Sequence, residues 1–285
     1  MAVFAATPAS RDRRPRDLPE TDDPARERLL RPEGAEPVNR TFAIGDIHGD
    51  AAALYRLLAS FPAMDETDTV VFVGDYLDRG PQSKEVVAFV RDLPTKIKAR
   101  VVALRGNHED AWLRVIDKGW PEFILPTGNG CLATLRSFRG EEPPVEGERM
   151  AVDEVQALLT GSFFPEDVIA WMRDLPHFYE DEHAIYVHAG LPRQDGEFPH
   201  PSEAKNPTAL LWCRDEAFFR LYTGKLVVFG HTSTELLPPE LSSYTPEDPT
   251  DIWAGPCTIG LDTGAGKGGW LTGLELPSLL VYESR

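Results

Sequence analysis

The feature that most constrains the fold is a three-part pattern that repeats along the chain from residue 41. An apolar, often β-branched run leads into a glycine-rich polar cluster, and the cluster leads into an amphipathic stretch. TFAI is followed by GDIHG and DAAALYRLLASF, and TVVFV is followed by GDYLDRGP and SKEVVAFVRDL. The apolar runs predict buried strands and the amphipathic stretches predict helices. Strands that alternate with helices predict an α/β domain.

Later segments extend the pattern and then change it. RVVAL leads into RGNHED, AIYV into HAG, and LVVF into GHT. The chain closes with CTIGLDTG, WLTGLEL and SLLVYE, which are strand-like runs without helices between them, so we expect more antiparallel sheet in the second half. VDEVQALLTG and FPEDVIAWMRDL predict helices inside a segment of different composition. We expect a mostly helical cap inserted at about 111–180.

The first forty residues differ from the rest in composition. They hold six prolines, eight arginines and eight acidic residues, so the whole net charge of −17 belongs to residues 41–285. We expect a disordered tail at 1–40 and one domain at 41–285. An acidic domain repels nucleic acid and anionic membranes, whereas metal cations are natural partners for it. We therefore expect neither a nucleic-acid nor a membrane partner.

Cysteine spacing and hydropathy bound the cellular context. The three cysteines form no CxxC pair, which disfavours a disulfide framework or a cysteine zinc site. The chain carries no secretory signal at its start and no apolar run long enough to span a membrane. We expect reduced thiols and a cytoplasmic location. The sequence leaves the oligomeric state open, with a monomer as the simplest expectation.

Five polar clusters follow the expected strands and carry potential metal ligands. Asp46 and His48 are two positions apart in an extended segment, so both point the same way, although a plain turn with a surface histidine would also fit that stretch alone. Chemistry in open α/β sheets collects beyond the carboxyl ends of strands. A ligand set of oxygen and nitrogen atoms suits Mn²⁺, Fe or Zn²⁺, and six ligands suit two metals that share a carboxylate. The clusters supply Asp46, His48, Asp75, Asn107, His108, His188 and His231.

The motifs resemble those of a known family. GDIHG, GDYLDRG and GNHE, followed by HAG and GH, resemble in order and spacing the PPP-type metallophosphoesterases, which include serine/threonine protein phosphatases and diadenosine tetraphosphate hydrolases. GNGCLATLRSF, LLWCRDE, KLVVFGHT and IGLDTG resemble the bacterial and lambda-phage branch of the protein phosphatases. The resemblance covers about residues 41–285. It implies a calcineurin-like β-sandwich flanked by helices, with the metals at the sheet ends.

The resemblance also implies a metal-ligand set. Two divalent ions are expected, with Mn²⁺ favoured and Fe or Zn²⁺ as alternatives. Asp75 would bridge them. The remaining ligands would divide into Asp46, His48 and His231 for one ion, and Asn107 and His188 for the other.

Further residues gain catalytic roles from the same resemblance. His108 would be the general acid, and Asp78 would orient it. Arg79 and Arg214 would bind the phosphoryl oxygens, with Asn107 also facing the substrate. Two alternatives stay open at this point. Asp78 and Arg79 could form a plain salt bridge within their loop, and Arg214 could be a surface residue.

The motifs leave three functions to separate. A serine/threonine protein phosphatase acting on a phosphoprotein or small phosphoester is favoured, because GNHE and LLWCRDE resemble that branch. A diadenosine tetraphosphate hydrolase is the alternative. A non-catalytic binding module is disfavoured, because no ligand or acid of the motif series is missing. TGAGKGG lacks the glycine and hydroxyl positions of a phosphate-binding P-loop and predicts a glycine-rich hairpin.

Overall fold

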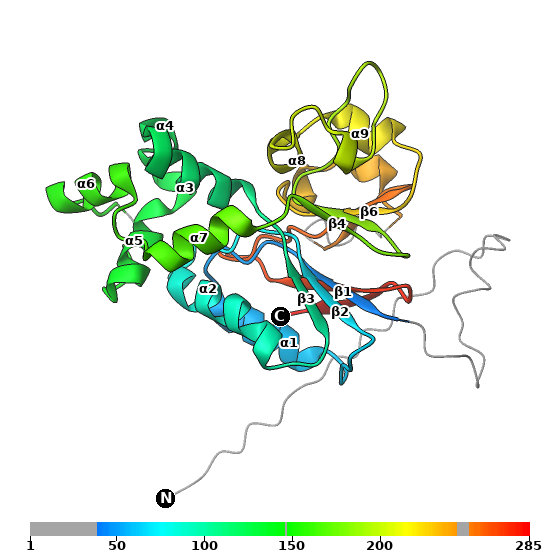
Figure 1. Cartoon of the computed structure of the whole chain (residues 1–285), viewed down its shortest axis with the longest axis horizontal. Helices are drawn as coiled ribbons and strands as arrows, with labels where there is room; N and C mark the ends of the chain where they lie inside the picture. Colours follow the sequence, from blue (N-terminus) through cyan, green and yellow to red (C-terminus); the bar gives the residue numbers. More distant parts are fainter. Residues whose placement is uncertain (1–38, 146, 244–250) are drawn as a thin grey trace, which may run out of the picture.

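The computed structural model describes residues 39–145, 147–243 and 251–285. Residues 1–38 of the expected tail lie outside these ranges. Within them, two five-stranded sheets lie one on the other, and helices cover their outer faces (Figure 1). The expected α/β sandwich is confirmed.

The first sheet has the strand order β10-β9-β1-β2-β3. Strands β1, β2 and β3 run parallel to one another, and β3 lies at the edge of the sheet. Strand β9 runs antiparallel to both β1 and β10. The strands are β1 (Thr41–Ile44), β2 (Thr69–Phe72), β3 (Arg100–Ala103), β9 (Thr272–Leu276) and β10 (Leu280–Glu283).

The second sheet has the order β4-β5-β6-β8-β7. Its inner strands β5, β6 and β8 are parallel, and the edge strands β4 and β7 are antiparallel to their neighbours. The strands are β4 (Phe178–Glu180), β5 (Ile185–Val187), β6 (Val227–Phe229), β7 (Trp253–Ala254) and β8 (Thr258–Gly260).

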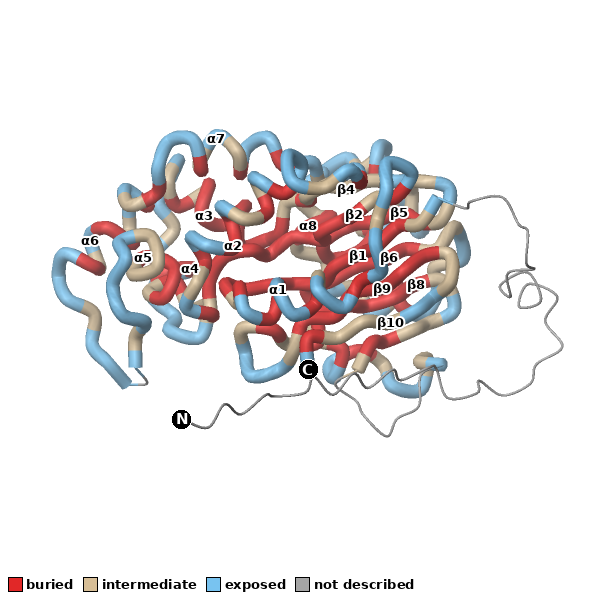
Figure 2. The backbone as a smooth tube through the Cα atoms, turned by 90° about the horizontal axis from the view of Figure 1, so that it is seen from below, coloured by how far each residue is buried: buried red, intermediate tan, exposed pale blue. Residues whose placement is uncertain are grey.

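Alternation along the strands builds the layers. Ala43 and Val71 of the first sheet and Tyr186 and Val228 of the second belong to one buried cluster between the sheets. Their neighbours in sequence, such as Phe42, point the other way and pack beneath the helices. Strands that are buried on both faces read as continuous apolar runs, which is why they stand out in the sequence. Figure 2 shows these buried residues running through the middle of the molecule.

Helices cover the outer face of the first sheet and extend beyond it as the cap. The side chain of Asp50 caps α1 by accepting the N–H of Ala53. Figure 1 shows the cap helices α3 to α7 on the left of the sheets. The helices are α1 (Ala51–Ser60), α2 (Ser83–Asp92), α3 (Asn107–Lys118), α4 (Pro121–Ile124), α5 (Cys131–Arg139), α6 (Val152–Thr160) and α7 (Glu166–Asp174).

Two short helices, α8 (Ala209–Trp212) and α9 (Glu216–Leu221), lie beside the second sheet. Phe218 and Phe219 of α9 pack against the outer face of that sheet. Short 3₁₀ turns join the elements at η2 (Leu93–Thr95), η3 (Thr127–Asn129), η4 (Pro201–Glu203), η5 (Thr234–Leu236) and η6 (Pro239–Leu241).

Two details differ from the sequence-based expectation, the end of the cap and the TGAGKGG segment. The range 111–180 ends inside β4, so residues 178–180 belong to the second sheet and not to the helical cap. The second half is richer in antiparallel pairs, as expected, because β4 pairs with β5, β7 with β8, and β9 with β1 and β10 in that sense. One closing strand, β8, pairs parallel to β6, and β9 crosses to the first sheet. TGAGKGG is therefore the crossing between the sheets and not a hairpin within one, although Gly264 and Trp270 form an isolated bridge there.

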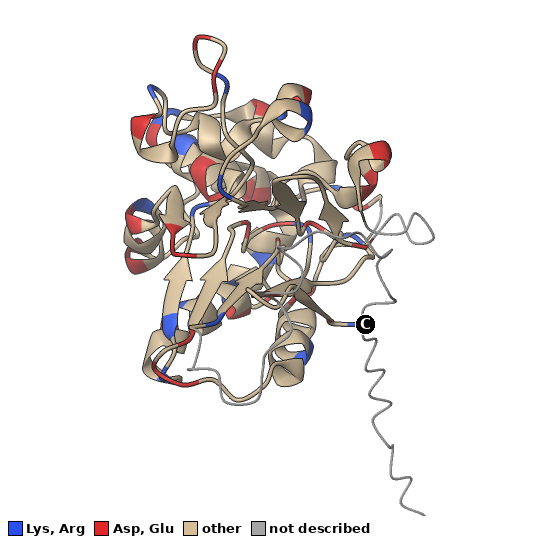
Figure 3. Cartoon of the chain, turned by 90° about the vertical axis from the view of Figure 1, so that its right-hand side faces the viewer, with Lys and Arg blue, Asp and Glu red and all other residues tan. Residues whose placement is uncertain are grey.

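Charged residues gather on the helices and loops, and the strands carry few of them (Figure 3). Over the described part of the chain, none of the helices has the length and apolarity needed to cross a membrane.

Candidate metal centre

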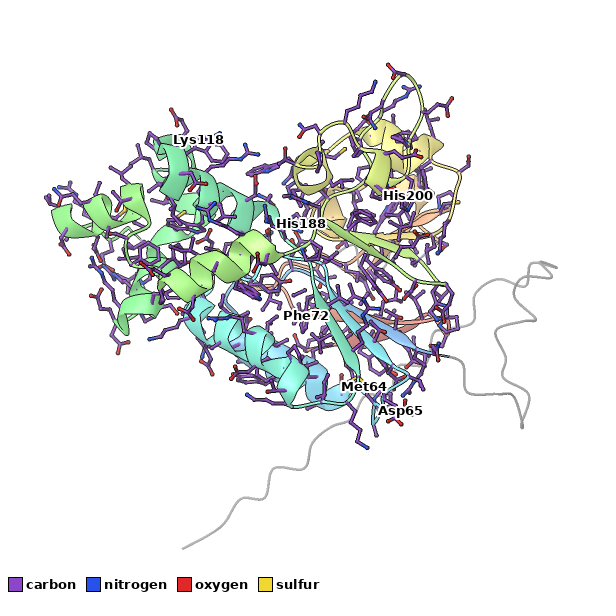
Figure 4. All side chains as sticks on the ribbon, viewed as in Figure 1. Met64, Asp65, Phe72, Lys118, His188 and His200 are labelled. Atoms are coloured by element: carbon purple, nitrogen blue, oxygen red, sulfur yellow. The ribbon has the colours of Figure 1, made fainter. Side chains whose placement is uncertain are left out.

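The expected ligands come together at one edge of the sandwich. Parallel strands of one sheet end at the same edge, so the loops that follow β1, β2 and β3 meet there. The loops after β5 and β6 of the second sheet reach the same place. Figure 4 shows His188 where the ends of the two sheets meet. The side chains brought together are Asp46, His48, Asp75, Asn107, His108, His188 and His231.

Asp75 lies at the middle of this cluster. One carboxylate oxygen is 3.5 Å from His48 Nε2, and the other is 3.4 Å from His188 Nε2. Asp75 belongs to two groups whose ligand atoms lie within 4.8 Å of one another, one with His48 and His108 and one with Asp46 and His188. All five side chains are buried. A carboxylate shared by two groups is the arrangement expected of a bridging ligand.

Asn107 joins the histidines of the second sheet. Its Oδ1 is 2.8 Å from His188 Nε2 and 2.7 Å from His231 Nδ1. His231 has a φ of 66°, and its backbone N–H donates to both carboxylate oxygens of Asp46. The backbone of His231 therefore lies against Asp46, while its ring lies with Asn107 and His188. The expected division, in which His231 serves the ion of Asp46 and His48, stays a prediction.

Backbone carbonyls fix the orientation of two imidazoles. His48 Nδ1 is 2.9 Å from the carbonyl oxygen of Leu77, and His188 Nδ1 is 2.9 Å from that of Val73. A carbonyl only accepts, so each Nδ1 carries the proton and donates it. The unprotonated Nε2 of each ring then faces Asp75, as metal-binding histidines require.

Burial sets the charge of the cluster. It lowers the pKa of His48, His188 and His231 below the ordinary histidine value, so these rings are neutral. Burial alone would raise the pKa of Asp75, but the neighbouring imidazoles, His188 and then His108, lower it below its usual range. The centre thus presents neutral imidazole nitrogens beside an ionised carboxylate, which is the donor state that divalent metals bind.

Two observations show that the residues fit divalent metal ions. His231 Nε2 is buried and has no hydrogen-bond partner among the described residues. Burial, followed by the charges of Asp262 and Asp75, raises the pKa of Asp46 well above its usual value. A cation at this point would satisfy the nitrogen and offset the repulsion between the carboxylates.

A second buried unit holds His108. Its Nδ1 is 2.7 Å from Asp78 Oδ2, and its Nε2 faces Asp75 at 3.9 Å. Trp112 Nε1 donates to both oxygens of Asp78 at 3.0 Å, and Thr134 Oγ1 donates to one at 2.6 Å. Burial opposes protonation of His108, but Asp75 and Asp78 outweigh it and raise its pKa above the ordinary value. Asp78 is thus hydrogen-bonded to His108 and does not form an ion pair with Arg79, the next residue.

Glu109 is a central residue that the motif reading did not single out. Its buried carboxylate accepts backbone N–H groups from the loop after β2 and from the loop after β3. The donors are Asp75 at 3.1 Å, Tyr76 at 2.9 Å, Leu77 at 3.3 Å and Gly106 at 2.9 Å. The acidic pair that follows His108 in GNHED was the available signal. A buried carboxylate with this many donors fixes the loops relative to each other.

The loops are held in conformations that most residues avoid. Seven described non-glycine residues have positive φ, and five of them lie at this centre, which stores about 1–3 kcal/mol of strain at each. Gly106 is required because a Cβ there would lie 2.1 Å from Asp75 Oδ1. Gly130 is required because a Cβ there would lie 2.2 Å from the backbone nitrogen of Arg79. The five strained residues are His48, Asp75, Asp78, Arg79 and His231.

The two arginines lie at the rim. Arg79 is half-buried, and its Nε is buried without a partner among the described residues. Arg214 is exposed and lines a hollow of about 640 Å³ together with Thr232, the neighbour of His231. Its charge is one of the causes, after burial and His188, that lower the pKa of His231. The binding of phosphoryl oxygens by Arg79 and Arg214 stays a prediction.

Metal binding is expected to depend on Asp75. Ions that bind only the folded chain stabilise it by about 2.7 kcal/mol at a hundred times Kd, so chelator-treated protein should melt below Mn²⁺-loaded protein. Asp75→Asn should lose most of the bound metal, measured by elemental analysis. Asp153→Asn, at an exposed cap carboxylate, is the control and should retain it. Wild-type metal content in Asp75→Asn would contradict the shared-ligand role.

Glu109→Gln is expected to weaken metal binding about 10–100-fold, the usual effect of losing a partner that orients metal ligands. The amide nitrogen that replaces one oxygen cannot accept a backbone N–H. Titration of stripped protein with Mn²⁺ measures the affinity, and chemical denaturation of the same samples measures the stability. Glu122→Gln, at an exposed glutamate on α4, should behave as wild type. A loss of stability with unchanged Mn²⁺ affinity would show that Glu109 is structural only.

Comparison with known proteins agrees with this geometry. Residues 40–235 match the model of the calcineurin-like phosphoesterase family. The chain is 33% identical over 117 residues to serine/threonine-protein phosphatase SIT4 of Candida albicans. The aligned segment covers 40% of this chain and 37% of that protein. Over 158 residues, it is 30% identical to the symmetrical bis(5'-nucleosyl)-tetraphosphatase of Stutzerimonas stutzeri, which covers 54% of this chain and 45% of that protein. The chain thus spans less than half of the length of these relatives.

Solved structures show the same fold. A crystal structure proposed to be a diadenosine tetraphosphatase superposes with a TM-score of 0.52 at 21% identity, covering 86% of this chain and 92% of that one. A cold-active protein-tyrosine phosphatase from a psychrophilic Shewanella species superposes with a TM-score of 0.50 at 18% identity, covering 94% and 87%. At these identities the likeness concerns the fold alone. The family match, which spans more than half of the chain, shows that this protein belongs to the calcineurin-like phosphoesterases.

Proposed function

We propose that this phosphoesterase is a serine/threonine protein phosphatase that uses two divalent metal ions, Mn²⁺ before Fe or Zn²⁺. Asp75 would be shared by the ions, and the other ligands would be Asp46, His48, Asn107, His188 and His231. When bound, such ions lower the pKa of a coordinated water and offset charge on phosphoryl oxygens.

The observation that carries the proposal is the buried pair of His108 and Asp78. Nδ1 of His108 donates to Asp78 at 2.7 Å, and Asp75 and Asp78 favour the imidazolium form, in which Nε2 also carries a proton and faces the centre. A serine or threonine leaving group departs as an alkoxide, a strong base that needs a proton. A phosphate leaving group is far less basic and gains less from an acid. A histidine whose pKa is raised by neighbouring carboxylates therefore suits phosphoserine and phosphothreonine esters best.

The arginines supply the anion-binding half of the site. The unpartnered Nε of Arg79 and the exposed guanidinium of Arg214 can each donate to phosphoryl oxygens, a contact that strengthens as charge shifts in the transition state. Asn107 lies between His188 and His231 and would face the same oxygens. These groups orient the phosphoryl group while His108 protonates the leaving oxygen.

A dinucleoside polyphosphate hydrolase is the second candidate. The match to the bis(5'-nucleosyl)-tetraphosphatase covers more of this chain than the match to the SIT4 phosphatase does. Both activities would use the same metal ligands. They differ in the leaving group and therefore in the need for the acid.

Parallel assays of the Mn²⁺-loaded protein distinguish the two candidates. A phosphoserine peptide and diadenosine tetraphosphate are assayed at equal concentrations, and kcat/KM is measured for each. We expect the peptide to exceed the dinucleotide by at least about tenfold, a difference of roughly 1.4 kcal/mol in transition-state stabilisation. The reverse preference would replace the proposal with the polyphosphate hydrolase.

His108→Asn is expected to lower kcat for an alkyl phosphate by about 10²–10⁴-fold, the usual contribution of a general acid. The loss should be smaller for an aryl phosphate, whose leaving group needs no proton. Metal content, measured on the same samples, should not change. His200→Asn is the control, because Figure 4 shows His200 away from His188. Equal losses for both esters, or loss of metal, would assign His108 to the ligands.

A further inference from the structure

A hollow of about 550 Å³ opens on the cap side of the metal centre. Helices α3 and α7 form one wall, and Thr208 at the start of α8 belongs to the other. We call it the cap groove. Its charged lining residues are Arg105, Asp110, Arg114, Asp117, Lys118 and Arg173.

The cap groove is positive in a strongly negative protein. Four of its side chains are cationic and two are anionic, whereas the whole chain carries −17. Asp110 pairs with Arg114 at 2.7 Å, and Asp117 pairs with Arg173 at 2.5 Å. Both carboxylates are therefore already neutralised by arginines of the groove itself.

Arg105 and Lys118 carry the positive charge that is left over. Arg105 donates to the carbonyl oxygen of Arg173, and its Nε is buried without a partner in the described part of the chain. Lys118 makes no ion pair with a described residue and is exposed at the end of α3. An anion that entered the groove would meet two cations without carboxylate partners.

The groove lies along the helix that begins at the metal centre. Asp110 is two residues after His108 on α3, and Lys118 ends that helix. At 1.5 Å per residue, Lys118 lies about 15 Å from His108 along the axis. Figure 4 shows Lys118 on the cap side, away from His188. An extended peptide rises about 3.3 Å per residue, so a residue two to four positions from a phosphoserine lies roughly 7–13 Å away and reaches this groove.

The aromatic residues beside the groove do not offer a free face for a nucleobase. The guanidinium of Arg114 lies 5.5 Å from the ring centres of both Trp120 and Trp212. Trp212 also donates from its Nε1 to Asp110 at 2.8 Å. Both rings are thus engaged with groove residues, which favours a carboxylate-bearing chain over a nucleotide as the occupant.

The geometry points to the cap groove as a recognition site for acidic residues that flank the phosphoserine or phosphothreonine of a peptide substrate. This inference rests on the proposed phosphatase function and names the substrate class for it. Carboxylates two to four positions from the phosphorylated residue would meet Lys118 and Arg105, while the phosphate itself would lie at the metal centre.

The test compares two phosphoserine peptides that differ only in their flanks. One carries three glutamates within four positions of the phosphoserine, and the other carries alanines there. We expect Mn²⁺-loaded wild type to prefer the acidic peptide by about fivefold or more in kcat/KM, because each exposed charge pair contributes roughly two- to fivefold at most. The preference should shrink as salt is raised, since exposed charges are screened.

The variant Lys118→Glu tests whether the acidic residues of the peptide bind in the cap groove. It should cut the ratio of acidic to neutral peptide by about two- to fivefold or more, because an attraction becomes a repulsion. Lys98→Glu, an exposed lysine in the loop before β3 at the opposite end of the sheet, is the matched control and should leave the ratio unchanged. Thermal unfolding of both variants confirms that they fold.

Different outcomes contradict different claims. Equal turnover of the two peptides by wild type, or an acidic preference that Lys118→Glu does not alter, overturns the groove assignment and leaves the phosphatase function standing. Hydrolysis of diadenosine tetraphosphate but of neither peptide overturns the proposed function and, with it, a peptide site. A loss in Lys118→Glu that appears only with diadenosine tetraphosphate reassigns the groove to polyphosphate.

Discussion

The structure depends on one buried carboxylate, that of Glu109, which accepts backbone N–H groups from the loops after β2 and β3. These loops carry Asp75, Asn107 and His108. Neither loop could hold its conformation alone, because Asp75 has a φ of 55° and Gly106 leaves no room for a side chain. The hydrogen bonds of Glu109 offset this strain and fix the carboxylate of Asp75, the amide of Asn107 and the imidazole of His108 relative to one another.

The electrostatics of the centre follow from the same burial. Taking Asp46, Asp75 and Asp262 out of water in one place is unfavourable, and the imidazoles and backbone N–H groups around them compensate only part of this cost. Lys267 of the glycine-rich crossing pairs with Asp262 at 3.2 Å and supplies part of the missing positive charge. Divalent cations would supply the rest. The affinity of the centre for metal and the stability of the fold are therefore two aspects of one charge balance.

Local sequence patterns predicted the strands that carry the ligands, because buried parallel strands read as apolar runs and their loops follow at once. The shared role of Asp75 came from the resemblance of the motifs to a known family and stays a prediction. The local patterns could not predict that β9 crosses to the first sheet, that the His231 ring faces Asn107, or that Trp112 and Thr134 hold Asp78. Each of these depends on a contact between residues far apart in the chain, which periodicity does not encode.

The cap contacts the candidate metal centre directly and is not a separate cover. Trp112 of α3 and Thr134 of α5 both donate to Asp78, so the carboxylate that orients His108 is itself oriented by cap helices. Helix α3 begins with Asn107 at the metal centre and ends with Lys118 in the cap groove. One rigid element therefore fixes both the acid and the groove. A displacement of the cap relative to the sheets would therefore move His108 and the groove together, so under the proposed function recognition of a substrate and its turnover would be coupled.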